Sequence, residues 1–266
     1  MSDLAIIAGQ GDLPAELAAR HPQARICALA GFAPDLPGVQ DFRLERLVPF
    51  LDGLVGAGIR RVVFAGAVTR PALNPEAFDP KTATLVPRIA MAMQSGDDAA
   101  LREVIAIFEE WGLHVLGLSD LAADLIPGAG VLAGSPTPRD EADAARAADI
   151  LSVTGPLDIG QGAVVAGGLC LAIETLPGTA AMLDFIATHR GGNSRGGVLF
   201  KAPKPGQDMR IDMPAIGPDT VAQAARAGLS GIAWAAGQVV MLRRAQTVQA
   251  AHEAGLFLWA RGQGPG

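Results

Sequence analysis

The chain has 266 residues, half of them hydrophobic and 18% charged, with a formal net charge of −6. This balance is typical of folded proteins and excludes a largely disordered chain. Because no run of Lys or Arg is present, nucleic acid is not expected as a partner, since proteins bind phosphate backbones chiefly by neutralising them. The length allows one large domain or two of moderate size.

The sequence has no pattern that predicts export or membrane insertion. The opening residues, MSDLAIIAGQGDLP, lack the basic region and cleavage site of a secretion signal, and no apolar run approaches the roughly 18–20 residues of a membrane span. Cys27 and Cys170 lie far apart in apolar surroundings, so we expect two buried thiols in a reducing cytoplasm. The four histidines are scattered singly, which gives little support for a histidine-based metal site.

Residues 1–132 alternate strand patterns with helical patterns. Apolar runs predict strands, and helical spacing with a capping sequence predicts helices; the strands are expected at 4–9, 24–31, 60–68 and 113–121, and the helices at 45–58 and from Ser95 onward. Alternation of this kind predicts a Rossmann-like parallel sheet with helices on both faces. The stretch 133–143, rich in Gly, Pro and small polar residues, is the expected linker.

Residues 144–266 mix hairpins with helices. Two apolar runs broken by Gly-Gly predict a β-hairpin at 162–175, and a second hairpin is expected at 231–242. Helical patterns cover 178–190 and 219–228, and 196–203 reads as a strand that enters a loop. The predicted fold class is therefore α/β, with an N-terminal Rossmann-like parallel-sheet domain and a C-terminal α+β domain.

A glycine-rich turn follows the first predicted strand. Gly9 and Gly11 stand between a strand and a helix, where backbone N–H groups and the helix N-terminus favour a phosphate or nucleotide. Pro14 takes the place of the third Gly of a dinucleotide fingerprint, which disfavours that motif. A tight strand–helix turn without a ligand is the alternative.

Two further polar segments follow in the first half. Gly66 lies near the end of the strand expected at 60–68, and Thr69 and Arg70 follow it directly, where open α/β sheets place ligands; a solvated Arg before a proline turn is the alternative. Asp97 and Asp98 begin a predicted helix. They either cap it, or one of them binds Mg²⁺ or a substrate hydroxyl.

Lysines gather in one short segment of the second half. Only three of the 21 basic residues are lysines, and Lys201 and Lys204 both fall in LFKAPKP. Chance explains this, or the two compact ammonium groups are directed at phosphates. The loop DIGQG, with Gln161, leaves backbone donors exposed before the next strand, unless its glycines serve only the turn.

The segment FKAPKPGQDMRIDMPAIGPDT, residues 200–220, is the richest in polar groups. Besides the two lysines it holds Gln207, Asp208, Arg210, Asp212 and Thr220, and its prolines restrict the path of the loop. Strand alternation in DMRIDM would place the two Asp residues and the Arg on one face. Cations with a carboxylate for a metal or a water are the parts that pyrophosphate hydrolysis needs, whereas the alternative is a surface loop with an Asp–Arg salt bridge.

Six segments together resemble a known family. IAGQGDLP, FAGAVTRP, SGDDAALR, LDIGQGAVV, FKAPKPGQDMRIDMPAIG and AARAGLSGIA occur in this order across almost the whole chain. They are similar to the LpxI-type UDP-2,3-diacylglucosamine pyrophosphatases, and KAPKP with the R-[VI]-D-[ML]-P-x-I-G pattern is the most distinctive part. Two departures are Asp12, where the family often has a small residue, and AAG at 235–237, where relatives have GEAG.

The resemblance implies Mg²⁺-dependent hydrolysis of UDP-2,3-diacylglucosamine to UMP and the 1-phosphate monosaccharide lipid X, in lipid A biosynthesis. It also implies two domains with the substrate held between them, and a homodimer. By analogy Asp212 is essential, and Lys201 and Lys204 contact phosphate. The mechanistic hypothesis is that Asp212 binds Mg²⁺, helped by Asp97 or Asp98. The nucleotide would lie toward Gly9, Gly11, Asp12, Gly66, Thr69 and Arg70, and the remaining substrate contacts would come from Asp97, Gln161, Gln207, Arg210 and Thr220.

The acyl chains of such a substrate require an apolar channel, which predicts peripheral contact of a cytoplasmic protein with the inner membrane. Two alternatives stand beside this reading. One is a different enzyme that acts on nucleotide sugars, and the other is a carrier that binds a lipid or nucleotide and leaves it intact. A calcineurin-like phosphoesterase is disfavoured because its His-rich metal motifs are absent from the sequence.

Overall fold

The computed structural model describes residues 2–68, 74–94, 97–191 and 195–262. The chain divides into two compact units. The first comprises Met1–Ala122 together with Asp208–Asp212, and the second comprises Ala123–Gln207 and Met213–Gly266. One short segment of the second half of the sequence thus belongs to the first unit.

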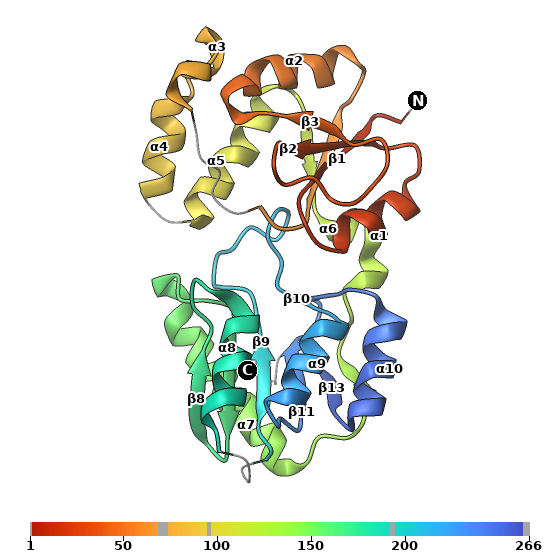
Figure 1. Ribbon diagram of the computed structural model, residues 1–266, viewed down its shortest axis with the longest axis vertical. Coiled ribbons are helices and arrows are strands. Elements are labelled where there is room, and N and C mark those ends of the chain that lie inside the picture. Colours follow the sequence, from red (N-terminus) through yellow and green to blue (C-terminus); the bar gives the residue numbers. More distant parts are fainter. Residues whose placement is uncertain (1, 69–73, 95–96, 192–194, 263–266) are drawn as a thin grey trace. The chain divides into compact units, whose positions relative to one another are not determined.

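The first unit is built on a five-stranded sheet of order β3-β2-β1-β4-β5 (Figure 1). All four neighbouring pairs are parallel, which confirms the Rossmann-like prediction. The strands are β1 Leu4–Ala8, β2 Arg25–Leu29, β3 Gln40–Phe42, β4 Arg61–Ala65 and β5 His114–Leu116, and the α-helices are α1 Leu13–Arg20, α2 Leu47–Gly56, α3 Pro80–Ala83, α4 Val86–Gln94, α5 Asp97–Glu110 and α6 Leu118–Ala122.

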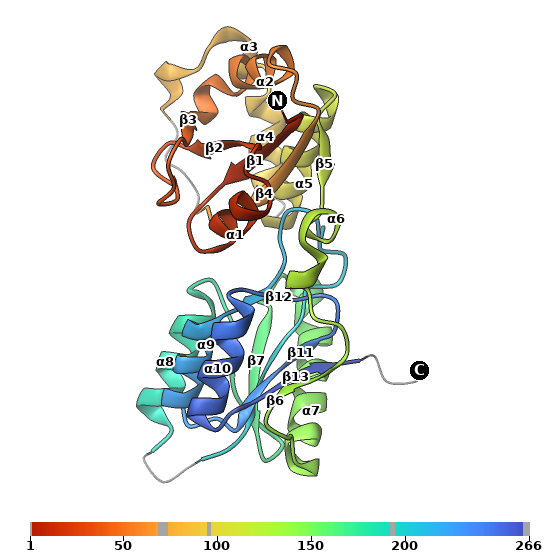
Figure 2. The same ribbon diagram turned by 90° about the vertical axis from the view of Figure 1, so that its right-hand side faces the viewer.

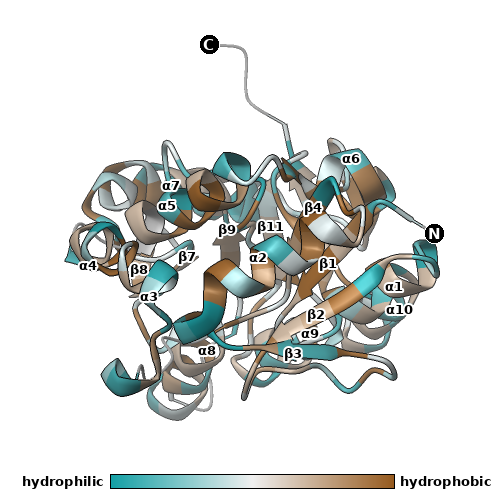
Figure 3. Cartoon of the chain, turned by 90° about the horizontal axis from the view of Figure 1, so that it is seen from above, coloured by the Kyte–Doolittle hydropathy of each residue, from teal (hydrophilic) through white to brown (hydrophobic). Residues whose placement is uncertain are grey.

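The core of this unit follows from strands that are apolar on both faces. All five residues of β1 are buried, and Figure 3 colours β1 and β4 as hydrophobic segments. Helices α2 and α5 pack on one face, where Leu51 and Phe108 join Ala5 and Ile7 in one cluster. Helices α1 and α6 contact each other and cover the opposite face (Figure 2). A parallel sheet covered on both sides explains the nearly continuous apolar runs in its strands.

The second unit contains a six-stranded mixed sheet of order β6-β13-β11-β9-β7-β8. The strands β9, β11 and β13 are parallel, whereas β6 and β7 run antiparallel to their neighbours. Its strands are β6 Gly130–Ala133, β7 Gly162–Ala166, β8 Leu169–Ile173, β9 Val198–Lys201, β10 Ala215–Ile216, β11 Gly231–Ala235, β12 Val240–Met241 and β13 Phe257–Arg261, and its α-helices are α7 Pro138–Thr154, α8 Gly178–His189, α9 Pro218–Arg226 and α10 Arg244–Ala254.

Helices cover both faces of this sheet as well. Helix α7 packs on one face, where Ala147 and Leu151 lie against Phe200. Helices α8, α9 and α10 cover the other face (Figure 2), in a cluster that includes Leu183 and the fully buried Trp234. The parallel strands β9, β11 and β13 end at the same edge of the sheet, at Lys201, Ala235 and Arg261.

The N-terminus of α7 lies inside the stretch expected as a linker. Thr137 and Asp140 form a capping box: the Thr137 N–H donates to Asp140 Oδ2 at 2.9 Å and the Asp140 N–H donates to Thr137 Oγ1 at 3.3 Å. Asp143, one turn further on and 2% exposed, accepts hydrogen bonds from the N–H groups of Gly167 and Gly168 at 2.8 and 2.7 Å. The division between the two units falls earlier, after Ala122.

The structure corrects three local predictions. The hairpin expected at 231–242 is wrong, because β11 pairs with β9 and β13 while β12 pairs with β10. The strand expected at 113–121 ends at Leu116, and α6 follows it after one residue. Cys170 is exposed on the edge strand β8 rather than buried, whereas Cys27 is buried as expected. The hairpin at 162–175 is confirmed as β7 and β8, joined through Gly167 and Gly168.

Across the residues that the structure describes, no helix has both the length and the apolar character needed to span a lipid bilayer.

Candidate functional site

Lys201 is the last residue of β9 and lies at the carboxyl edge of the second sheet. It is 6% exposed, and its Nζ donates a hydrogen bond to Thr179 Oγ1 at 2.7 Å and to the Ala215 carbonyl at 3.3 Å. The Glu174 carboxylate lies 3.8 Å from the same Nζ through Oε2. Burial of an ammonium group is unfavourable unless it is paired and hydrogen-bonded, and these three groups meet that need.

Lys204 forms the second ammonium–carboxylate pair of this edge. Its Nζ donates to Asp158 Oδ1, and the Lys204 side chain is only 9% exposed against 42% for Asp158. The backbone of Asp158 is left-handed, with φ of 59°, which is an unusual conformation for a residue other than Gly. Asp158 therefore places its carboxylate beside Lys204 from a backbone conformation that costs conformational free energy.

The loop from Lys204 to Gln207 is closed by hydrogen bonds in both directions. The Lys204 N–H donates to Gln207 Oε1 at 2.8 Å, and the Gln207 N–H donates to the Lys204 carbonyl at 3.1 Å. The Pro205 ring packs on Gly155, where a Cβ would lie 2.5 Å from Pro205 Cδ. Gln207, one of the predicted substrate-binding residues, thus has a clear role in fixing the backbone that carries Lys204.

The glycines of the loop 158–162 are required by Glu174. A Cβ at Gly160, whose φ is +58°, would lie 2.0 Å from the Glu174 carbonyl oxygen. A Cβ at Gly162 would lie 2.5 Å from Glu174 Oε2. Gln161 lies between them, and its carbonyl accepts a hydrogen bond from the Ala202 N–H at 3.1 Å. The loop, the strand β9 and Glu174 are therefore packed as one assembly around Lys201.

Residues 208–212 form a turn that belongs to the first unit. The N–H groups of Ile211 and Asp212 both donate to the Asp208 carbonyl, each at 3.3 Å, and Ile211 packs against the core of the first unit. The strand expected for DMRIDM is therefore wrong. The loop's local hydrogen bonds and the packing of the partly buried Ile211 side chain favour a turn over an extended segment.

Arg210 is engaged by carboxylates of the same unit. Its Nη2 lies 2.7 Å from Asp208 Oδ2 and its Nη1 lies 2.9 Å from Glu109 Oε1. The hydrogen bonds from Arg210 lower the pKa of the Asp208 carboxyl, and those from Asp208 raise the pKa of Arg210. The Asp–Arg salt bridge that the alternative interpretation expected is present, so Arg210 fixes the turn that carries Asp212.

Two turns of the first unit meet at the carboxyl ends of β1 and β4. A Cβ at Gly9 would lie 2.5 Å from the Ala67 carbonyl oxygen, and one at Gly66, whose φ is +92°, would lie 2.6 Å from the Gln10 carbonyl oxygen. Gln10 and Ala67 also exchange backbone hydrogen bonds of 2.8 and 2.9 Å. Close approach of two backbones therefore explains both glycines at the point where the strand order reverses, which is where such sheets bind ligands.

The next turn residues precede α1. Gly11 has φ of +98° and no atom within 4 Å of the position a Cβ would take, and Asp12 occupies the N-cap without a capping hydrogen bond from its side chain. Thr69 and Arg70 lie outside the described residues. Asp97 and Asp98 begin α5, and only their backbone is described.

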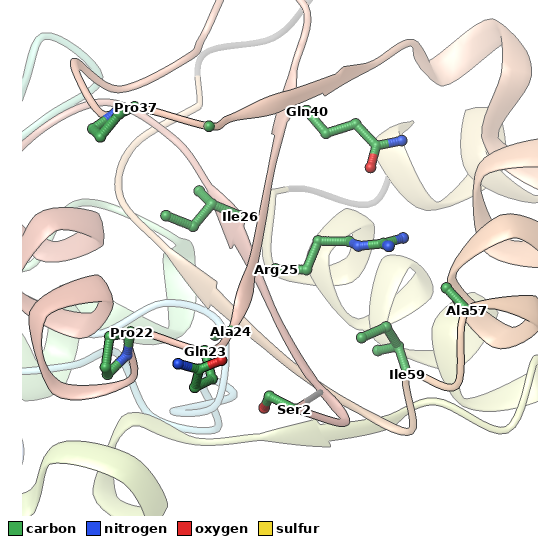
Figure 4. Close-up of a pocket in the computed structure, with 11 residues that line it drawn as sticks. Ser2, Pro22, Gln23, Ala24, Arg25, Ile26, Pro37, Gln40, Ala57 and Ile59 are labelled. Carbon is green, nitrogen blue, oxygen red and sulfur yellow. The ribbon is translucent and has the colours of Figure 1, made fainter.

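Two hollows lie away from these residues. One, of about 440 Å³, is lined by residues such as Arg25, Ile26 and Gln40, which stand at or near the amino ends of parallel strands (Figure 4). The other, of about 650 Å³, includes Gly197 and Ser230, which directly precede β9 and β11. Both therefore lie at the edge opposite to the one where open α/β sheets bind ligands.

Comparison with known proteins identifies the family. The model of the LpxI N-terminal domain matches residues 3–125, and that of the LpxI C-terminal domain matches residues 128–259. The chain belongs to the LpxI family. It is 39% identical over 272 residues to the UDP-2,3-diacylglucosamine pyrophosphatase LpxI of Caulobacter vibrioides, with 97% of each chain covered.

In this LpxI-family chain the predicted site residues are distributed over both units. Lys201, Lys204 and Gln207 belong to the second unit, whereas Asp212 belongs to the first. Thr220 caps α9, because its Oγ1 accepts a hydrogen bond from the Gly217 N–H at 3.2 Å. The contacts of these residues with substrate and metal stay predictions.

Sequence reasoning missed Glu174 and Thr179. Both follow β8 in the segment ETLPGT, which has neither a glycine–phosphate turn nor a charge cluster. The signal available was indirect: a lysine at the end of a buried strand requires a carboxylate partner, and a carboxylate directly after a neighbouring strand is one candidate.

Proposed function

We propose that this chain hydrolyses the pyrophosphate bond of UDP-2,3-diacylglucosamine, giving UMP and 2,3-diacylglucosamine 1-phosphate in lipid A biosynthesis. The observation that carries the proposal is the near full-length similarity to the Caulobacter pyrophosphatase. It is supported by two lysines at the carboxyl edge of the second sheet, where parallel sheets bind their ligands. One water is consumed, and its oxygen ends on one of the two phosphate products.

Lys201 and Lys204 stabilise the negative charge that develops on the diphosphate. Each ammonium group is already paired with a carboxylate, Lys201 with Glu174 and Lys204 with Asp158, and Lys201 also donates to the Thr179 hydroxyl. Preorganised cations of this kind contribute more to the transition state than mobile ones, because they need no reorganisation during the reaction. Asp158 holds the Lys204 ammonium group in place, and Glu174 does the same for Lys201.

The nucleotide is recognised by the turns that follow β1 and β4. Gly9 and Gly66 bring the two backbones together, and the open space beside Gly11 leaves the N-terminus of α1 accessible to an anionic group. Thr69 and Arg70 are proposed to add side-chain contacts. The Asp12 carboxylate at this N-terminus favours contact with ribose or base over direct contact with a phosphate.

We assign Mg²⁺ to Asp212, with Asp98 as second ligand. Within the described part of the chain, no group of three or more His, Cys, Asp or Glu side chains is arranged to hold a metal. The two carboxylates of Asp212 and Asp98 fit Mg²⁺, because this ion commonly uses one or two carboxylates and takes its other oxygens from water and substrate phosphates. When bound, the ion supplies charge neutralisation to the diphosphate.

The protein is further proposed to be a cytoplasmic homodimer that contacts the inner membrane peripherally. Leu169, Leu176 and Phe185 are 70%, 95% and 54% exposed on the second unit, and such side chains suit contact with acyl chains or with another apolar surface. Flotation with phospholipid vesicles tests the membrane contact, and light scattering after size exclusion tests the homodimer.

Phosphorus NMR of purified protein with UDP-2,3-diacylglucosamine and Mg²⁺ tests the activity. The proposal expects the two pyrophosphate signals to be replaced by two phosphomonoester signals, and expects the reaction to stop with Asp212→Ala or after metal chelation. Pyrophosphate signals that persist in the presence of wild-type protein would identify a carrier. Hydrolysis of UDP-glucose at the same rate would point to a different nucleotide-sugar enzyme.

A further inference from the structure

Lys201, Thr179 and Glu174 form a directional chain of hydrogen bonds. Lys201 Nζ donates to Thr179 Oγ1 at 2.7 Å, and Thr179 Oγ1 donates its own proton to Glu174 Oε2 at 2.7 Å. Because the hydroxyl hydrogen is directed at the carboxylate, a lone pair of the same oxygen faces the ammonium group. The orientation of the Thr179 hydroxyl is thus set by Glu174.

The two charged members of this chain are largely shielded from solvent. The side chains of Lys201 and Glu174 are 8% and 13% exposed. A buried ammonium group without a negative partner loses its proton or moves toward water. Among the described contacts that surround Lys201, Glu174 supplies the negative charge, and Thr179 and the Ala215 carbonyl supply oxygens.

The glycines of the neighbouring loop are an independent observation on the same carboxylate. Gly162 leaves the space that Glu174 Oε2 occupies, because a Cβ there would lie 2.5 Å from that atom. The Glu174 N–H donates to the Gly162 carbonyl at 2.7 Å, which ties the backbone before α8 to β7. The loop of the DIGQG motif is therefore shaped around Glu174.

We propose that Glu174, acting through Thr179, is a positioning residue for Lys201, so that the ammonium group remains charged and directed at the substrate diphosphate. The inference rests on the proposed function of Lys201. It assigns a role in the reaction to Glu174 and Thr179, and it explains Gly162 as the residue that admits the carboxylate. A merely structural Glu174 would instead act on folding and leave the contribution of Lys201 unchanged.

A double-mutant cycle separates these possibilities. We expect Lys201→Met to lower kcat by about 100-fold or more, and Glu174→Gln to lower kcat by about 10- to 100-fold with a smaller change in KM. In the Lys201→Met background, Glu174→Gln should change kcat by less than about twofold, because the group it positions is gone. Equal factors in both backgrounds, or a wild-type kcat in Glu174→Gln, would overturn the proposal.

Three further variants keep the test decisive if Glu174→Gln folds poorly. Thr179→Ser should retain most activity and Thr179→Val should lose it, since only Ser restores the hydroxyl. Gly162→Ala should fold, because its backbone does not require positive φ and the clashing atom is a side-chain end, yet lower kcat by displacing the carboxylate. Wild-type kcat in both Thr179→Val and Gly162→Ala would refute the role of Glu174.

Asp184→Asn is the matched control. Asp184 also lies on α8, but it is 60% exposed and pairs with Arg226 at 2.8 Å, so its neutralisation should leave kcat and KM at wild-type values. Failure of the proposed function is recognised separately, because wild-type protein would then release no UMP. If wild-type protein is active and the cycle is additive, only the positioning role is lost.

Discussion

Substitution of Asp158 by Gly is expected to reduce activity while leaving stability almost unchanged. Asp158 adopts φ of 59° and its carboxylate accepts a hydrogen bond from Lys204. Gly has no Cβ and enters the left-handed region at no steric cost, so Asp158→Gly removes backbone strain and the carboxylate together.

The two effects on stability are of similar size and opposite sign. Left-handed conformation costs an L-residue roughly 1–2 kcal/mol, and Asp falls near the lower limit because its short polar side chain tolerates that region. The Asp158 side chain is 42% exposed, and an ion pair of that exposure contributes at most about 1 kcal/mol. We therefore expect a net change within about 1 kcal/mol, which shifts Tm by no more than about 4 °C.

Activity is expected to respond more strongly than stability. Without Asp158, the Lys204 ammonium group is no longer held where the diphosphate is proposed to bind, and kcat/KM should fall by about tenfold or more. Release of UMP from UDP-2,3-diacylglucosamine measures the rate, and differential scanning fluorimetry measures Tm. Asp158→Asn is the control, because Asn tolerates the same backbone but carries no charge, so it should lose as much activity.

The result that refutes this reasoning is a wild-type kcat/KM in Asp158→Gly with Tm unchanged. Asp158 would then be a turn residue only, and Lys204 would not depend on it. A fall in Tm well beyond 4 °C in Asp158→Gly, with Asp158→Asn unaffected, would equally contradict the estimate of strain.

Three further outcomes are expected. Asp143→Ala, which leaves two N–H groups of the β7–β8 turn without their buried acceptor, should lower stability by about 2–4 kcal/mol, and Asp143→Asn by about half as much, in urea unfolding followed by circular dichroism. At pH 8 a thiol reagent should titrate Cys170 alone in the folded protein and Cys27 only after denaturation, because burial raises the pKa of Cys27 to about 11. Arg210→Met should raise the pKa of Asp208 toward its ordinary value near 4, as read by NMR titration. In wild type the pKa of Asp208 is lower in the folded than in the unfolded protein. The stability that wild type gains over the variant is therefore present at neutral pH and is lost as the pH falls below about 4.

The elements with strong local signals are those that the sequence predicted well. Strand β1 is apolar throughout and is followed by a Gly turn, and the hairpin of β7 and β8 is marked by Gly167 and Gly168. In both cases the pattern and the tertiary packing favour the same structure. The helix α5 likewise begins within two residues of the predicted capping sequence at Ser95.

Elements that depend on distant partners were mispredicted or missed. The run 231–242 contains two apolar segments around a Gly, which is the pattern of a hairpin, but β11 is a central parallel strand whose partners lie more than 20 residues away in sequence. Helix α10 begins after Arg243, which has a left-handed backbone and no capping hydrogen bond from its side chain. A helix without a capping residue gives no start signal in the sequence.

The candidate site shows the same division between local and distant information. The two lysines and Asp212 were apparent from composition and motif, because they lie within 12 residues of one another. Glu174 was not, since its proximity to Lys201 arises from the strand order β9-β7-β8, which brings the end of β8 near the end of β9 across the intervening strand. No periodicity within either segment encodes that order.

The pairing of each lysine with a carboxylate has a consequence for how a diphosphate is recognised. A carboxylate that neutralised Lys201 fully would weaken its attraction for substrate, and an ammonium group with no partner would be unstable in a site this buried. At 3.8 Å, with the Thr179 hydroxyl interposed as the direct acceptor, Glu174 supports the charge without forming the short bidentate contact that would compete most strongly with phosphate oxygens. Arginine would not serve equally well, because its planar fork favours two-point contact with the nearest carboxylate. This physical difference favours Lys over Arg at position 201, where the direct acceptor is the Thr179 hydroxyl rather than a carboxylate.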